Sequence, residues 1–255
     1  MSCALLIISI ANALVGTSIG ICGIAGFLLP ILYTEILHYT VDQALAYSFL
    51  AFLVSGVLGS ISYHKAGNLA ISTSLKLGAG SLIGALAGVC LQALIAKNTA
   101  KEILYIVVLI SGVSILLRMY SDKKKSAQPS PAQPNKKNLV QNNAFLLFLG
   151  VTTGAVCSLS GAGGPVLVMP LLVTFGISAR LAVGIALFDS VFIAIPACIG
   201  YLARIDLSWP LLALIALSHG IGVISGSKIA GKVPVPALKL FVAVFSVFIA
   251  IYMLL

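Results

Sequence analysis

Long apolar runs, separated by short polar segments, dominate the chain. A helix needs about 20 apolar residues to cross the hydrocarbon core of a bilayer. Six of the eight runs fit one crossing, and the first run on each side of a central polar stretch is too long for one. The pattern predicts an all-α polytopic membrane protein. Its runs are Ala4–Leu37, Gln43–Tyr63, Leu69–Ala96 and Ile103–Met119, then Ala144–Phe175, Leu181–Ala203, Leu207–Ile229 and Ala237–Leu255.

Glycine and proline interrupt the two overlong runs. Residues 20–26 read GICGIAG with Pro30 beyond them, and residues 158–165 read SLSGAGGP with Pro170 beyond them. Glycine is costly inside a helix, and proline removes a backbone donor. We therefore predict two broken segments, each a re-entrant hairpin or a pair of shorter helices.

A polar, lysine-rich stretch over residues 121–143 divides the chain into two halves, residues 1–120 and 144–255. It cannot bury enough apolar surface to fold, and its lysines predict a cytoplasmic linker. One offset of 138 residues also relates the halves. It pairs Gly16 with Gly154, Gly23 with Gly161, Gly26 with Gly164, Tyr63 with Tyr201, Leu69 with Leu207, Gly84 with Gly222, and Gly88 with Gly226. We interpret this register as an internal repeat.

The positive-inside rule bears on the symmetry of the repeat. An even number of crossings per half places Lys65 and Arg204 on the side of the linker, with most other cations opposite. An odd number places Lys65, Arg180, Lys228 and Lys232 on that side and leaves Lys97, Lys101 and Arg204 opposite. The odd count obeys the rule better, and it makes the repeats inverted.

Composition excludes a water-soluble enzyme, because 60% of the residues are hydrophobic and only 8% are charged, against roughly a quarter in soluble domains. The net charge of +9 comes from the linker and from cations near the ends of apolar runs, which indicates membrane anchoring rather than nucleic-acid binding. No basic residue precedes the first apolar run, so we expect that run to be retained rather than cleaved as a signal peptide.

The two glycine breaks are the candidate binding site. Irregular backbone in a membrane persists where it lines a cavity or is buried in protein, and a helix that starts there presents free N–H groups to an anion. In the second half the candidate ligands are Ser158, Ser160, Gly161, Gly163 and Gly164, and Cys22 occupies the position that matches Ser160. Glycines at a spacing of four, at 80, 84, 88, 222 and 226, instead predict close helix packing.

Asp189 lies in the stretch Ala182–Ile195, which is otherwise apolar apart from the adjacent Ser190. A carboxylate at the centre of a membrane helix costs about 2.5–3.5 kcal/mol, so we assign it a proton-coupling or gating role. A structural, hydrogen-bonded carboxyl is the alternative. His219 also lies in an apolar run, where a proton relay and a packed core histidine are both open.

The chain resembles the TauE/SafE family of anion permeases, also called the toluene-sulfonate uptake permease family. The resemblance rests on GAGGP at 161–165 with Met169 and Pro170, on Gly200-Tyr201, and on IDLSWP at 205–210. The first half repeats a weaker form, and the resemblance covers nearly the whole chain apart from the linker. It implies transport of sulfite, sulfoacetate or related sulfur anions across a prokaryotic inner membrane, with proton coupling.

The chain departs from the family pattern at two places. Cys22 and Ala25 stand where the family often has glycine, and Ala46-Tyr47-Ser48 stands where it often has a Thr-Ser pair, which makes Ser48 a candidate ligand. The matching position in the second half, Gly184-Ile185-Ala186, has no hydroxyl. A substrate shell with two-fold symmetry is therefore not expected.

These observations predict a secondary transporter for a small sulfur anion, without a cofactor, a metal or a nucleic-acid partner, and they leave a homo-oligomer open. Ser158, Ser160, Gly161, Gly163 and Gly164 would bind the anion from one side and Cys22, Gly23, Gly26 and Ser48 from the other. A passive anion channel or uniporter is the main alternative. An intramembrane thiol redox enzyme is disfavoured, because no cysteine has a base or a cation nearby in the sequence.

Overall fold

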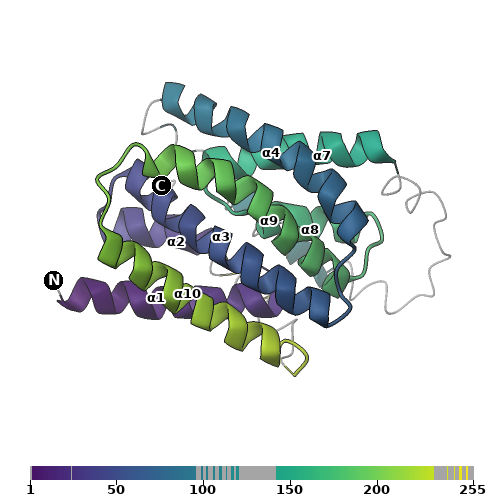
Figure 1. Ribbon diagram of the computed structural model, residues 1–255, viewed down its shortest axis with the longest axis horizontal. Helices are drawn as coiled ribbons and strands as arrows, with labels where there is room; N and C mark the ends of the chain where they lie inside the picture. The colour runs from purple at the N-terminus through teal and green to yellow at the C-terminus, as the bar shows by residue number, and fades with distance from the viewer. Residues whose placement is uncertain are drawn as a thin grey trace.

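A computed structural model describes residues 2–23, 25–95 and 142–232, with isolated positions in 99–120 and 240–251. Six of its helices are long and apolar enough to span a membrane. The predicted spans Ile103–Met119 and Ala237–Leu255, and the linker up to residue 141, lie largely outside the described residues. The elements in chain order are α1 (Ser2–Cys22), α2 (Leu28–Ile31), the π-helical turn η1 (Leu32–Ile36), α3 (Val41–Lys65), α4 (Ile71–Leu94), α7 (Asn143–Ser160), α8 (Gly164–Thr174), α9 (Ala179–Leu202) and α10 (Trp209–Ile229) (Figure 1).

Both overlong runs are broken where the glycines predict it. The first becomes α1, α2 and η1, and the second becomes α7 and α8. Gly161 ends α7 in the left-handed region at φ 74°, and Gly23 follows α1 at φ 70°. Glycine adopts this conformation without steric cost, which explains why the helices stop at these residues.

Helix starts in the two halves keep the register of the predicted repeat. The helices α3 and α9 begin at Val41 and Ala179, and α4 and α10 begin at Ile71 and Trp209, so that both pairs are offset by 138 residues. The start of α3 is fixed by a capping box, in which Gln43 N donates to Thr40 Oγ1 over 3.3 Å and Thr40 N donates to Gln43 Oε1 over 3.1 Å.

Helices of the first half pack mainly on helices of the second. The most extensive contacts join α4 to α7, α1 to α10, and α3 to α9, and Figure 1 shows the last pair in the middle of the bundle. The order of contacts shows that α1 and α10 run parallel, because Gly16 faces His219 whereas Gly20 faces Val223 and Ser227. The helices α4 and α7 are also parallel.

The central pair α3 and α9 is antiparallel. Gly56 of α3 lies against Val191, Gly59 against Leu187, and Gly184 of α9 lies against Asn68, just beyond the end of α3. Each half therefore contributes one helix to the centre and one helix to each flanking pair. The predicted packing role of the four-spaced glycines is confirmed, since Gly80, Gly84, Gly88, Gly222 and Gly226 all face the backbone of a partner helix.

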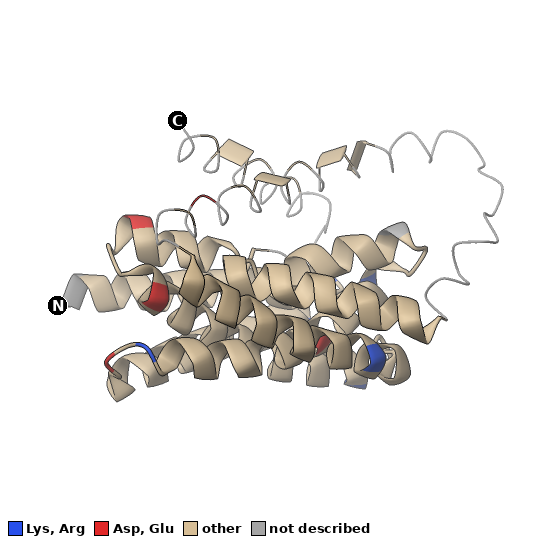
Figure 2. Cartoon of the chain, turned by 90° about the horizontal axis from the view of Figure 1, so that it is seen from above, with Lys and Arg blue, Asp and Glu red and all other residues tan. Residues whose placement is uncertain are grey.

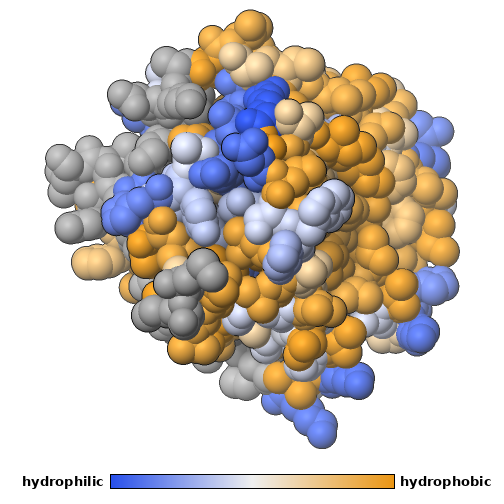
Figure 3. Space-filling view, turned by 60° about the vertical axis from the view of Figure 1, so that its left-hand side comes forward, coloured by the Kyte–Doolittle hydropathy of each residue, from blue (hydrophilic) through white to orange (hydrophobic). Residues whose placement is uncertain are grey.

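Most of the charged residues lie near the two ends of the bundle (Figure 2). We call the end where α3 begins the Asp42 end and the opposite one the Lys65 end. The described basic residues of the Lys65 end are Lys65, Lys76, Arg180, Lys228 and Lys232. Figure 3, turned toward the Asp42 end, shows a polar patch with hydrophobic surface to its right. Exposed apolar side chains, among them Leu14, Leu86, Ile199 and Leu217, cover the flanks and provide a surface for lipid contact.

Candidate functional site at the two helix breaks

The second break is a tight left-handed turn stabilised by its own side chains. Gly161 and Gly163 have φ values of 74° and 77°. Ser160 Oγ donates to Val156 O over 2.7 Å and accepts from Ala162 N over 3.3 Å, and the Cys157 thiol donates to Gly163 O over 3.4 Å. The turn leads directly into the 11-residue helix α8, whose first residues are Gly164 and Pro165.

The backbone of the first break has a less favourable conformation than that of the second. Its position equivalent to Gly163 is Ala25, which has a φ of 99° although it carries a Cβ atom. Left-handed backbone is strained for a residue other than glycine. The segment after this break is also shorter, because α2 has 4 residues and the π-helical η1 has 5. The two breaks are therefore related but not equivalent, as the departures of the first half from the family pattern predict.

The two breaks meet on one face of α3. A Cβ atom added at Gly26 would lie 2.9 Å from the Phe52 ring, and one added at Gly163 would lie 3.3 Å from the same ring. Two turns earlier, Leu45 of α3 lies against Gly161. On α9, Val183 lies against Gly23 and Ser190 against Gly164. The two break segments also contact each other directly, because Gly23 lies against Pro165 and Gly161 lies against Pro30.

Ser48 lies between Leu45 and Phe52 on this face of α3, since residues three and four apart share one side of a helix. Its side chain has no exposed surface, and its hydroxyl has no hydrogen-bond partner within the described part of the chain. Hydroxyls in membrane helices usually bond to their own backbone. Ser55, two turns later, does so, because its Oγ donates to Phe52 O over 3.1 Å. Ser48 is therefore a buried donor that is available to a ligand at the breaks.

Two candidate ligands point elsewhere in this structure. Ser158 Oγ donates to Ala155 O over 3.2 Å and lies against Gly88 of α4. The Cys22 thiol donates to Ser18 O over 3.3 Å, within its own helix. The structure thus brings together Ser48, Ser190 and the break glycines Gly23, Gly26, Gly161, Gly163 and Gly164, and it turns the side chains of Ser158 and Cys22 toward other groups.

Asp189 lies one residue from Ser190, on the side of α9 that faces α4 and α7. Its carboxyl is fully buried, and neither oxygen has a hydrogen-bond partner among the described residues. Ser81 of α4 and Cys157 of α7 are its polar neighbours. The Ser81 hydroxyl donates instead to Gly150 O over 3.3 Å. A buried carboxyl without a partner is costly, which supports a functional rather than a structural role.

Equivalent tyrosines bond to the ends of the broken helices. Tyr63 Oη of α3 donates to Gly20 O over 3.2 Å and to Ile21 O over 3.1 Å. Tyr201 Oη of α9 donates to Ser158 O over 2.7 Å. The last carbonyls of a helix lack intrahelical donors, so these phenols satisfy carbonyls near the helix ends. The sequence marked the two tyrosines only as repeat and family positions.

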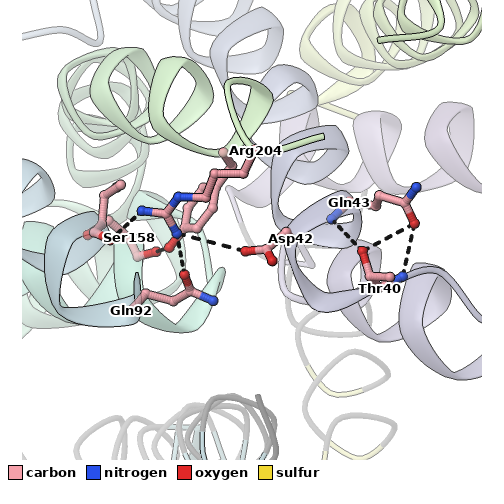
Figure 4. A network of polar contacts seen from close by, with 8 residues as sticks. Thr40, Asp42, Gln43, Gln92, Ser158 and Arg204 are labelled. Carbon is pink, nitrogen blue, oxygen red and sulfur yellow. Dashed lines mark hydrogen bonds and ion pairs between the residues drawn. The ribbon is translucent and has the colours of Figure 1, made fainter. Parts of the chain in front are cut away.

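Arg204 joins three elements at the Asp42 end (Figure 4). It donates to Gln92 Oε1 over 2.6 Å and to Val89 O over 3.0 Å, both on α4, and it lies 3.8 Å from the Asp42 carboxylate at the start of α3. Its guanidinium also lies over the Tyr201 ring, 5.2 Å from the centroid. The sequence indicated only an interfacial anchor here, because nothing in it signals that Gln92 and Arg204 meet.

Broken segments that meet inside a helical membrane bundle are typical of transporters. The chain belongs to the TauE/SafE sulfite exporter family, whose model, described as "Sulfite exporter TauE/SafE", matches residues 4–254. It is therefore a membrane transporter of that family, as its motifs predict.

Two bacterial relatives are similar to the chain over different lengths. "Probable membrane transporter protein YdhB" of Bacillus subtilis (strain 168) is 24% identical over 237 residues, which cover 92% of this chain and 94% of the relative. "Probable membrane transporter protein YtnM" of the same organism is 29% identical over 161 residues, which cover 63% of this chain and 51% of the relative. No solved structure matches the chain.

Proposed function

We propose that the protein carries a small sulfur-containing anion, such as sulfite or an organosulfonate, across the cell membrane by proton-coupled alternating access. The observation that carries this proposal is the meeting of the two breaks on the face of α3 that holds the unpartnered hydroxyl of Ser48. Membership of a family of sulfite exporters supports the chemical class of the substrate.

Backbone groups supply most of the proposed anion site. The first N–H groups of a helix have no intrahelical acceptor and lie at the positive end of its dipole. At the start of α8 these groups belong to Gly163 and Gly164, which have no side chain to keep an anion away. Ser160 and Gly161 extend this side of the site, and Gly23, Gly26 and Ser48 form the other. The sequence candidates Ser158 and Cys22 would take part only after their side chains turn from Ala155 O and Ser18 O. Such a site binds an anion without a buried lysine or arginine.

We further propose that the two halves are inverted repeats with the Lys65 end in the cytoplasm. The antiparallel packing of α3 on α9, which begin 138 residues apart, supports a two-fold axis in the membrane plane. Lys65, Arg180 and Lys228 lie at one end, as the positive-inside rule requires of a cytoplasmic face. The linker leads into α7 at this same end, which favours an odd number of crossings per half.

Alternating access would be a rocking motion around the breaks. Each flanking pair, α1 with α10 and α4 with α7, contains one helix from each half, so each pair would move as a unit against α3 and α9. The apolar contacts of Leu45 with Gly161 and of Val183 with Gly23 would separate as the anion enters. Asp189, with Ser190 beside it, would carry the coupled proton or hold the gate.

Uptake into proteoliposomes that contain the purified protein tests this function. Sulfite, sulfoacetate, taurine and chloride would each be offered with and without an imposed proton gradient. We expect saturable flux of a sulfur anion that follows the gradient. Flux that ignores the gradient would identify a uniporter or channel. If folded protein moves no sulfur anion, the proposed substrate class is wrong.

Ser48→Ala is expected to weaken sulfite binding without loss of folding. A hydrogen bond to a charged group contributes about 1.5–3 kcal/mol, so the dissociation constant should rise roughly tenfold to a hundredfold. Ser55→Ala is the matched control, because Ser55 is buried on the same helix but bonds to its own backbone. Titration of both purified variants with sulfite measures the difference. Equal affinity for sulfite in the two variants would remove Ser48 from the site.

A further inference from the structure

A second group of polar side chains is buried between α1, η1 and α10, away from Asp189. His219 of α10, Asn12 of α1 and Tyr33 of η1 all have no exposed surface. Asn12 Nδ2 donates to Tyr33 Oη and to Ile8 O, each over 2.8 Å. The ring of His219 faces the backbone of Asn12.

This group is not satisfied internally. Both ring nitrogens of His219 and Oδ1 of Asn12 have no hydrogen-bond partner among the described residues. A neutral imidazole carries one N–H donor and one free acceptor, so the cluster has a donor and two acceptors to spare. Buried polar groups are normally paired because an orphaned one costs about 1–3 kcal/mol. Unpaired polar groups inside an apolar bundle indicate that this cluster binds a ligand reversibly and does not serve packing alone.

The internal register relates this cluster to the surroundings of Asp189. The offset of 138 residues pairs His219 with Ser81 and Asn12 with Gly150. Ser81 and Gly150 form a hydrogen bond across α4 and α7, and Ser81 is the polar neighbour of the Asp189 carboxyl. Each flanking pair thus carries polar residues at positions related by this offset. A titratable side chain of the apolar interior belongs to each group, namely Asp189 beside Ser81 and His219 beside Asn12.

A row of tyrosines connects the cluster to the Asp42 end. The ring of Tyr33 lies 5.6 Å from that of Tyr47 and 6.1 Å from that of Tyr39, measured between centroids, and these two rings lie 5.5 Å apart. Tyr39 is half-buried and directly precedes Thr40, which caps α3. The three tyrosines thus form a continuous aromatic row between the Asp42 end and Asn12.

We propose that His219, with Asn12 and Tyr33, is a second proton-binding site of the transporter, loaded from the Asp42 end. A proton from water there would bind the free ring nitrogen, and the imidazolium would donate to the backbone carbonyl of Asn12, which the ring faces. Around the ring, α1 contributes Asn12, to which Tyr33 of η1 is hydrogen-bonded, and α3 places Val54 and Leu58 against the neighbouring Gly220. No carboxylate of the described residues faces the ring, so the bound proton leaves a net positive charge that attracts the anion. The coupling role rests on the proposed function, whereas proton binding does not.

Imidazole nitrogen NMR of the full chain tests proton binding without any transport. The chain has three histidines, so the double variant His38→Gln/His64→Gln leaves His219 as the sole signal. We expect this signal to change from neutral to protonated between about pH 9 and pH 4, a range that brackets the ordinary titration of histidine. Tyr33→Phe, which keeps the ring and removes the hydroxyl, should alter the transition. A ring that stays neutral over the whole range overturns the proposal.

Proton and sulfite fluxes in proteoliposomes then test the coupling. We expect His219→Gln to carry about one proton fewer per sulfite than the wild type, since a glutamine cannot take up a proton, and His64→Gln at the Lys65 end to behave as the wild type. An unchanged ratio in His219→Gln overturns the coupling role. If the wild type moves no sulfur anion, the proposed function fails, and the NMR titration still decides whether His219 binds a proton.

Discussion

Asp189→Asn is expected to abolish the accumulation of sulfite that a proton gradient drives, while exchange of sulfite across the membrane continues. Asparagine keeps the shape of the side chain but cannot bind and release a proton. One pH unit corresponds to about 1.4 kcal/mol per coupled proton, so a gradient of one unit should support about tenfold accumulation in the wild type and none in the variant. Uptake by proteoliposomes with and without the gradient measures this.

The matched control is Asp42→Asn, which changes a carboxylate at the end of α3 that is 22% exposed and pairs with Arg204. It should retain gradient-driven accumulation. Unaltered pH dependence in Asp189→Asn would contradict the coupling role. If the protein is a channel, the wild type will show no accumulation, and the wild type and Asp189→Asn will have the same flux.

Gly84→Ala is expected to cause the largest loss of stability among simple substitutions. A Cβ atom at this position would collide with the carbonyl oxygen of Val151 and would lie 2.9 Å from Ala155 N, both on the backbone of α7. Backbone cannot rotate away as a side chain can, so α4 and α7 must separate. Overpacking of this kind costs typically about 1–3 kcal/mol, and the parallel approach of the two helices depends on small residues. Thermal unfolding in detergent measures the effect.

A second glycine at a close approach of two helices allows a replicate of this experiment. Gly222→Ala places its Cβ against the carbonyl oxygen of Ala13 in the equivalent pair, α1 and α10, and should destabilise the protein to a similar extent. Gly231→Ala is the control, since nothing lies within 4 Å of a Cβ atom there. If all three variants melt at the same temperature, helix approach at these glycines is not limiting.

The apolar pattern predicted the helices well because membrane helices are read from length and composition alone. The bounds of α3, α4, α9 and α10 lie within two residues of their predicted runs at most ends, and the glycines located both breaks. The four-spaced glycines predicted close packing but not the partners. The packing partner of α4 is determined by contacts between residues distant in the chain, because the glycine pattern fits any helix with a small-residue face.

Side-chain directions at the site were less predictable than its position. The sequence placed Ser158 and Ser160 together near the anion, yet Ser158 occupies the gap opposite Gly88, a contact between α7 and α4. The pairing of Arg204 with Gln92, which are 112 residues apart, likewise depends on the packing of α9 against α4. Ser48 was found only through the family pattern, because an isolated serine in an apolar run carries no other signal.

The interleaving of the halves has a consequence for biosynthesis. The main partner of α1 is α10, which begins about 200 residues later in the chain. At synthesis rates of about 5–20 residues per second, α1 waits about 10–40 s in the membrane with its glycine face uncovered. The first half therefore cannot reach its native packing before the second is inserted. A ribosome that stalls in the linker would leave a fragment for membrane proteases to remove.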